Sequence, residues 1–160
     1  MIDLNKYKEF VKTVTSTESN NKVALIRQLE ALDNKVNIAL LTVTDTRTLQ
    51  TDKSGAILVN KIKEQNHNLV DRKIVKDEKG EIKKILTAWI KRNDLDVIIT
   101  TGGTGLTGRD ITPEAIKDIK DKEIPGFGEL FRELSYKTIG TSAMQSRACA
   151  ILANGKYIFA

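Results

Sequence analysis

The sequence has little of what several common kinds of functional site require. Its 160 residues include one cysteine, Cys149, and one histidine, His67. The single cysteine excludes an internal disulfide and suits a reducing compartment. With so few of these residues, a zinc site, a Ser-His-Asp triad and a Cys-His pair are poor candidates. Acid–base or metal chemistry would therefore fall to carboxylates, lysines or the backbone.

Long apolar runs and clustered aromatic residues are also missing. No stretch approaches the roughly 20 apolar residues of a membrane-spanning helix, and the N-terminus, MIDLNKYKEF, carries charges where a signal peptide needs an apolar core. Only 5% of the residues are aromatic, and none cluster beside the lysines, which argues against nucleic acid binding despite a net charge of +5. We expect a cytoplasmic protein that binds neither nucleic acid nor membranes.

Alternating strand and helix patterns fill the middle of the chain. The patterns predict strands at 36–44, 69–75 and 96–101, helices at 52–65 and 81–92 and from Pro113, and a further helix after Pro125-Gly126. Asp52 is the expected cap of the first of these helices. Asn154-Gly155, between apolar runs at 148–153 and 156–160, is typical of a type I′ hairpin. This order predicts an α/β fold with a mainly parallel sheet and one C-terminal β-hairpin.

The first 34 residues have a different character from the rest. Apolar residues at helical spacing occur near Tyr7 and again at about 23–32, separated by the polar stretch TSTESNN. We therefore expect a helical N-terminal extension at 1–34 and one domain at 35–160. Two such helices form either an arm that docks a partner or a layer packed on their own domain, and we slightly favour the second.

The most informative segment is DVIITTGGTGLTGRDITPEAI, residues 96–116. A predicted strand runs into Gly102, Gly103 and Gly105, and Thr112 and Pro113 predict the N-cap and first turn of a helix. A glycine loop between a strand and a helix lets backbone N–H groups approach a phosphate. The segment is neither a P-loop nor a G-x-G-x-x-G motif, and the alternative is a tight turn from sheet to helix.

Three aspartates occupy equivalent positions after three predicted strands. Asp45, Asp77 and Asp110 each follow a strand, and carboxyl ends of parallel strands meet at one edge of a sheet. A single aspartate after a strand is more often a helix cap or a turn residue. Together around a glycine loop, they predict a site for Mg²⁺ and phosphate, because Mg²⁺ prefers one or two carboxylates plus phosphate oxygens.

Four more side chains have either a ligand-binding or a local structural role. The hydroxyls of Thr104 and Thr107 would donate to a ligand or satisfy backbone groups nearby. Ser146 and Arg147 precede the predicted hairpin. Arg147 would clamp a phosphate bidentately or form an ordinary surface pair.

Five segments, in order, resemble the molybdenum cofactor biosynthesis family, which includes the MogA and MoaB proteins and the G domain of gephyrin. They are VTDTRTLQTDKSG (43–55), IVKDE (74–78), TTGGTGLTGRDITPEA (100–115), PGFGELFRELSY (125–136) and IGTSAMQSRA (139–148). The last two are most similar to the bacterial MoaB branch. The resemblance covers about residues 36–160 and implies a three-layer α/β/α sandwich assembled as a trimer or a dimer of trimers.

The resemblance also implies a ligand and a reaction. Adenylating members bind molybdopterin, a pterin dithiolene whose terminal phosphate attacks the α-phosphorus of Mg-ATP to give adenylylated molybdopterin and pyrophosphate. By resemblance, Asp77 and Asp110 match the essential aspartates, and we take them as catalytic residues and Mg²⁺ ligands. The candidate molybdopterin- and phosphate-binding residues are Asp45, Thr101, Gly102, Gly103, Thr104, Gly105, Ser146 and Arg147.

The chain departs from the adenylating pattern at three places. Thr44 replaces the usual serine, Lys76 replaces the usual proline, and family members continue beyond the position of Ala160 with a turn and a helix. We therefore expect a C-terminally truncated domain or a variant with a weakened site. The alternatives are a molybdopterin adenylyltransferase and a non-catalytic MoaB-type protein that binds molybdopterin or another pathway protein. A nucleotide-processing enzyme of the competence/damage-inducible family ranks third.

Overall fold

One mixed sheet organises the part of the chain that the computed structural model describes, residues 35–160. The strands are β1 (Asn37–Val43), β2 (Asn68–Val75), β3 (Val97–Thr101), β4 (Lys122–Glu123), β5 (Ala150–Ala153) and β6 (Lys156–Phe159). Their order is β2-β1-β3-β6-β5-β4. β1 pairs in parallel with β2 and β3, and β3 with β6, whereas β5 runs antiparallel to both β6 and β4. The predicted mainly parallel sheet with a C-terminal hairpin is confirmed.

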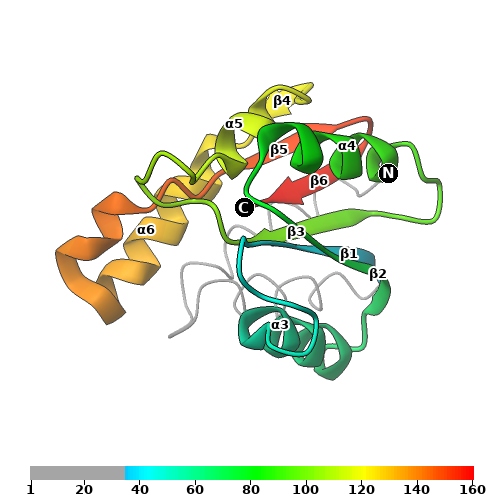
Figure 1. Ribbon diagram of the computed structural model, residues 1–160, viewed down its shortest axis with the longest axis horizontal. Coiled ribbons are helices and arrows are strands. Elements are labelled where there is room, and N and C mark those ends of the chain that lie inside the picture. The colour runs from blue at the N-terminus through cyan, green and yellow to red at the C-terminus, as the bar shows by residue number, and fades with distance from the viewer. Residues whose placement is uncertain (1–34) are drawn as a thin grey trace.

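Helices cover both faces of this sheet, which confirms the three-layer sandwich (Figure 1). α3 (Lys53–Glu64) lies on one face, and α4 (Lys79–Ile90) and α5 (Thr112–Lys117) lie on the other. Alternate strand residues point to opposite faces, so Ile38 and Leu40 pack with α3 while Ala39 and Leu41 pack with α4. The two predicted helices of residues 1–34 lie outside the described residues.

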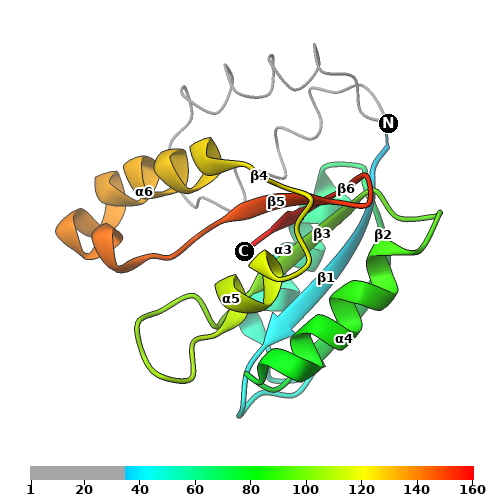
Figure 2. The ribbon, with the colours of Figure 1, turned by 90° about the horizontal axis from the view of Figure 1, so that it is seen from above.

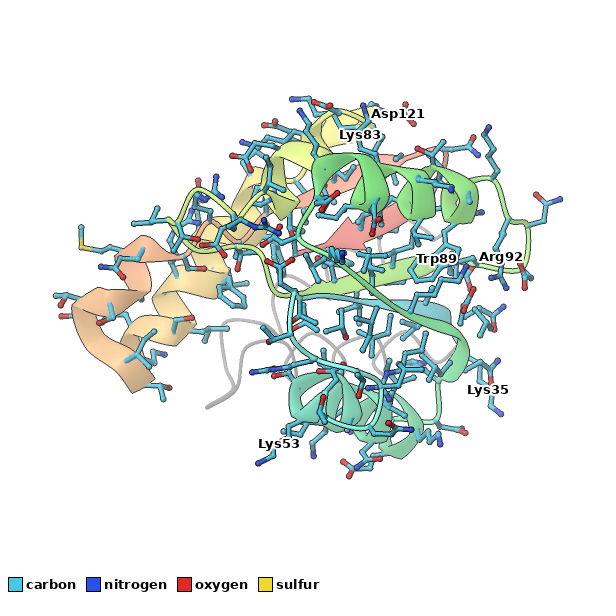
Figure 3. All side chains as sticks on the ribbon, in the orientation of Figure 1. Lys35, Lys53, Lys83, Trp89, Arg92 and Asp121 are labelled. Atoms are coloured by element: carbon cyan, nitrogen blue, oxygen red, sulfur yellow. The ribbon has the colours of Figure 1, made fainter. Side chains whose placement is uncertain are left out.

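The apolar stripe of α4 forms its contact with the sheet, as its spacing predicts. Ile82, Leu86 and Trp89 are buried on this stripe. The Trp89 indole N–H donates to Asp71 Oδ2 at 2.9 Å, and Arg92, just beyond the helix, donates to the same oxygen at 2.9 Å (Figure 3). This end of α4 lies far from the carboxyl edge of β3, where the glycine loop begins.

The helix α6 (Pro125–Ile139) and the 3₁₀ turn η1 (Gly140–Gln145) extend beyond the carboxyl edge of the sheet (Figures 1 and 2). Phe127 anchors the start of α6, since its ring centroid lies 5.1 Å from that of Phe159. Leu134 is buried, whereas Leu130 and Phe131 are half-buried. None of the described helices is long and apolar enough to cross a bilayer.

A polar side chain caps the first turn of α3 but not that of α5. Asp52 caps α3 as predicted, accepting a hydrogen bond from Gly55 N at 2.9 Å. The prediction that Thr112 is the N-cap of the next helix is wrong, because Ile111 holds that position and Thr112 is the first residue of α5. The Thr112 hydroxyl instead donates to Gly102 O at 3.0 Å, which ties the glycine loop to the helix.

Candidate functional site

The segments that the sequence predicts to converge do so at the carboxyl edge of the sheet (Figure 1). The segments that follow β1 and β2 are joined by a hydrogen bond from Asp77 N to Asp45 Oδ1, at 3.2 Å. The segments that follow β2 and β3 are joined by one from Ile111 N to Asp77 Oδ1, also at 3.2 Å. The segment before β5 joins them where Arg147 N donates to Thr104 O at 3.2 Å.

Asp77 lies against the middle of the glycine loop, in negatively charged surroundings. A Cβ placed on Gly103 would lie 3.0 Å from both of its carboxylate oxygens. Burial raises the pKa of Asp77, the nearby charges of Asp110 and Asp45 raise it further, and these effects outweigh the hydrogen bond from Ile111. A cation placed here would relieve this repulsion.

The surroundings of Asp110 stabilise its ionised carboxylate, whereas those of Asp77 disfavour ionisation. Its Oδ2 accepts hydrogen bonds from Thr107 Oγ1 at 2.6 Å and from Thr107 N at 2.9 Å. The Thr107 hydroxyl and the backbone N–H groups of Thr107 and Gly105 hold the pKa of Asp110 below its usual value. Asp110 is therefore a fully ionised carboxylate at neutral pH, held in a fixed orientation by the loop.

The glycine loop is built around these two carboxylates. Gly103 has φ +64°, and a Cβ there would lie 2.2 Å from the Thr112 hydroxyl oxygen. A Cβ on Gly105 would lie 2.7 Å from Asp110 Oδ2. A tight turn alone would not require glycine at both positions. Glycine is needed here because side chains outside the turn, the two carboxylates among them, lie against the backbone of the loop.

Arg109 is a residue of this site that the sequence analysis did not single out. Its guanidinium donates to Asp45 Oδ1 at 2.8 Å, and 62% of its side chain is exposed. This contact links the loop after β3 with the loop after β1. An arginine among so many surface charges gives no signal in the sequence, and only the pairing identifies it.

The remaining predicted site residues lie at the same edge, where they bond to other groups of the protein. The Arg147 guanidinium donates to Gly105 O at 2.7 Å, to Asp110 O and to the Glu114 carboxylate. The Ser146 hydroxyl accepts a hydrogen bond from Ala148 N at 3.3 Å. Thr101 is the last residue of β3 and is half-buried.

Residues 39–160 match the model of a family described as a probable molybdopterin binding domain. The chain belongs to the molybdenum cofactor biosynthesis family. It is 47% identical over 126 residues to molybdenum cofactor biosynthesis protein B of Bacillus cereus, covering 78% of this chain and 75% of that protein. A crystal structure of a molybdenum cofactor biosynthesis protein B matches with a TM-score of 0.76 and 46% identity over 79% of each chain. A MogA structure matches with a TM-score of 0.70 and 26% identity, covering 77% of this chain and 81% of that one.

In this member of the molybdenum cofactor biosynthesis family, the carboxyl edge offers oxygen ligands for a hard cation. No group of three or more His, Cys, Asp or Glu side chains in residues 35–160 is arranged to hold a metal ion alone. Within the same residues, Asp77 Oδ2 accepts no hydrogen bond. A cation held by Asp77 and Asp110 would therefore take its other ligands from a bound phosphate and water, which is the coordination typical of Mg²⁺.

Proposed function

We propose that this chain binds molybdopterin and adenylylates its terminal phosphate with ATP and Mg²⁺. The observation that carries the proposal is the packing of Asp77 and Asp110 against two glycines of one loop, in a chain of this family. The two carboxylates have opposite pKa shifts, so one site combines an oriented anion with an anion that needs neutralising. Phosphoryl chemistry asks a protein mainly for such positioning and charge neutralisation.

The proposed reaction forms one P–O bond and breaks another. An oxygen of the molybdopterin phosphate bonds to the α-phosphorus of ATP, and the bond from that phosphorus to the β-bridging oxygen breaks, so pyrophosphate leaves with the electron pair. Mg²⁺, held by Asp77 and Asp110, would neutralise the phosphate oxygens during this step. Arg109, which pairs with Asp45, supplies an exposed positive charge near Asp77, and the glycine loop allows a phosphate to approach the backbone.

Binding of molybdopterin without adenylylation is the second candidate function. This function is favoured because the chain is 47% identical to a molybdenum cofactor biosynthesis protein B but only 26% identical to the MogA structure. Lys76 also stands next to Asp77, where the resemblance leads us to expect proline, so this loop lacks a fixed φ. A flexible loop at this position would bind a phosphate yet orient it poorly for transfer.

The test is formation of adenylylated molybdopterin from molybdopterin, ATP and Mg²⁺ by the full chain and by Asp77→Asn. The variant keeps an acceptor for Ile111 N but loses the charge, so we expect product to fall by about a hundredfold or more. Asp121→Asn is the matched control, because Asp121 also accepts a backbone N–H, from Asn154, and is exposed at another part of the surface (Figure 3).

Each outcome separates the two candidate functions. Product that is lost in Asp77→Asn and kept in Asp121→Asn supports the adenylyltransferase. Molybdopterin binding with no product from the unmodified chain supports binding alone. Product that is undiminished in Asp77→Asn would remove Asp77 from the mechanism, and absence of molybdopterin binding would contradict both functions.

A further inference from the structure

Arg147 makes more hydrogen bonds to the glycine loop than a surface arginine needs. Its backbone N–H donates to Thr104 O at 3.2 Å, and its Nε donates to Gly105 O at 2.7 Å. One terminal nitrogen donates to Asp110 O and the other to Glu114 Oε1. Three of the four acceptors lie in the segment between β3 and α5 that carries Asp110, and the fourth, Glu114, lies in α5.

In these contacts each of the three guanidinium nitrogens donates a hydrogen bond. Carbonyl groups in an irregular loop have no strand or helix partner, and a loop whose carbonyls lack partners is poorly defined. Arg147 gives two such carbonyls a donor, one on each side of the loop tip, and gains a carboxylate partner from α5. Its side chain is 30% exposed. Three of its five guanidinium N–H groups, one on each nitrogen, thus already bond to the loop or to α5.

Given the proposed function, we infer that Arg147 is a positioning residue, which holds the glycine loop and Asp110 in their binding geometry and does not contact the phosphate itself. The more exposed arginine of the loop, Arg109, then remains as the cation that meets the phosphate. This assignment decides between the two roles that the sequence leaves open for Arg147.

The planar guanidinium explains why a lysine would not serve here. One rigid fork reaches two carbonyl oxygens and a carboxylate at the same time, whereas an ammonium group is a point charge on a flexible stem. Arg147→Lys should therefore keep the positive charge but no longer hold the glycine loop in its position. A phosphate contact based on charge alone would be largely retained in the same variant.

The surroundings of Arg147 permit a chemical rescue. A cavity of about 350 Å³ borders it, between α5, β5 and the start of α6, and is also lined by Glu114, Gly128, Arg132 and Cys149. A small cation from solvent can enter a cavity of this size. In Arg147→Ala, ethylguanidinium replaces the missing atoms, and ethylammonium supplies the charge without the fork.

The first experiment is amide hydrogen exchange in the ligand-free chain. In Arg147→Ala we expect the amides of Thr107 and Asp110 to exchange about tenfold faster or more, with protection restored by ethylguanidinium and not by ethylammonium. Arg147→Lys should give the same fast exchange, and it is informative even where the alanine variant does not fold. Arg92→Ala is the matched control, because Arg92 is 31% exposed, bonds to two carboxylates and lies at the far end of α4.

A second experiment measures adenylylation kinetics with Arg147→Lys. Positioning predicts a fall in kcat of about tenfold or more with a small change in the KM for molybdopterin, whereas a direct phosphate contact predicts a raised KM. Unchanged exchange at Thr107 and Asp110 in both variants would overturn the inference, with or without a raised KM. The exchange experiment needs no substrate, so it decides the role of Arg147 even if the chain proves not to adenylylate.

Discussion

At the scale of single residues, Asp77 and Asp110 show how neighbouring groups can shift the pKa of the same type of side chain in opposite directions. Asp110 accepts hydrogen bonds from Thr107 and is stabilised as an anion. Asp77 is partly buried between two other carboxylates, which disfavours its ionised form. A raised pKa of this kind has a consequence for stability, because ionisation then costs more in the folded chain than in the unfolded chain.

Asp77→Asn should increase the free energy of unfolding at pH 7. With the folded pKa above 3.8, the stability contributed by the protonated form is complete below that value and is lost as the pH rises through the folded pKa. The neutral amide avoids this loss and still accepts from Ile111 N. Urea unfolding between pH 3 and pH 8 checks this, and the advantage should disappear at the acidic end. A variant less stable than the parent at pH 7 would contradict the shift.

Gly103→Ala should destabilise the fold and disturb the site together. Gly103 has φ +64°, and its Cβ would lie 2.2 Å from the Thr112 hydroxyl and 3.0 Å from the Asp77 carboxylate. We expect a loss of about 1–3 kcal/mol in the free energy of unfolding. Gly108→Ala is the control in the same loop, since nothing lies within 4 Å of its Cβ position and its φ is not positive. Equal effects of the two substitutions would exclude the packing argument.

At the scale of elements, the start of α3 depends on a buried polar group. Asp52, 1% exposed, accepts hydrogen bonds from Gly55 N, from Thr42 Oγ1 at 2.6 Å and from Arg72 at 3.1 Å. Burial alone would raise the pKa of Asp52, but these three partners outweigh it and the pKa is lowered. One side chain thus connects α3 with β1 and β2, on the face opposite to α4.

Asp52→Ala should therefore cost more than the loss of a helix cap. It removes the cap and leaves the partly buried Arg72 without its partner, so we expect a loss of about 2–4 kcal/mol in the free energy of unfolding. Because the folded pKa is lowered, the stabilisation is present above the ordinary pKa of 3.8 and is lost as the pH falls through the folded value. Lys53→Ala, at the exposed neighbouring residue, is the control and should change little, as chemical denaturation would show.

At the scale of the whole molecule, apolar side chains are exposed at the end that carries the site. Tyr136 and Ile139 on α6 and Met144 on η1 are 59%, 55% and 79% exposed, and Leu106 in the glycine loop is 67% exposed. These elements extend beyond the sheet (Figure 2). Exposed apolar residues gathered in this way are typical of a protein–protein interface.

We expect the chain to assemble as a trimer or a dimer of trimers through α6 and η1. Ile139→Glu would place a charge in that interface and should shift the chain to monomers in sedimentation velocity. Ile57→Glu is the matched control, because Ile57 is 53% exposed on α3, away from this end (Figure 1). A chain that is monomeric before substitution, or an oligomer that survives Ile139→Glu, would contradict the proposed interface.

Much of the fold could be predicted because its signals are local. The β-branched runs, the helical stripe through Trp89 and the pair Asn154-Gly155 each depend on near neighbours in the chain. Both residues of that pair have positive φ, at 46° and 72°, as a type I′ turn requires. The strand β4 was not predicted, since Lys122 and Glu123 have no strand pattern of their own and pair only because β5 lies beside them.

The sequence by itself determined that strands alternate with helices, that a glycine loop follows β3, and that Asp45, Asp77 and Asp110 lie at one edge, because these properties follow from periodicity and from the geometry of parallel sheets. Only the tertiary structure decided the use of each polar group. Thr112 ties down the loop where a cap was expected, Asp77 accepts a hydrogen bond from Ile111 N, and Arg147 donates to carbonyl groups that lie over thirty residues away in sequence. Hydrogen-bond partners at such separations depend on three-dimensional positions, which no local pattern encodes.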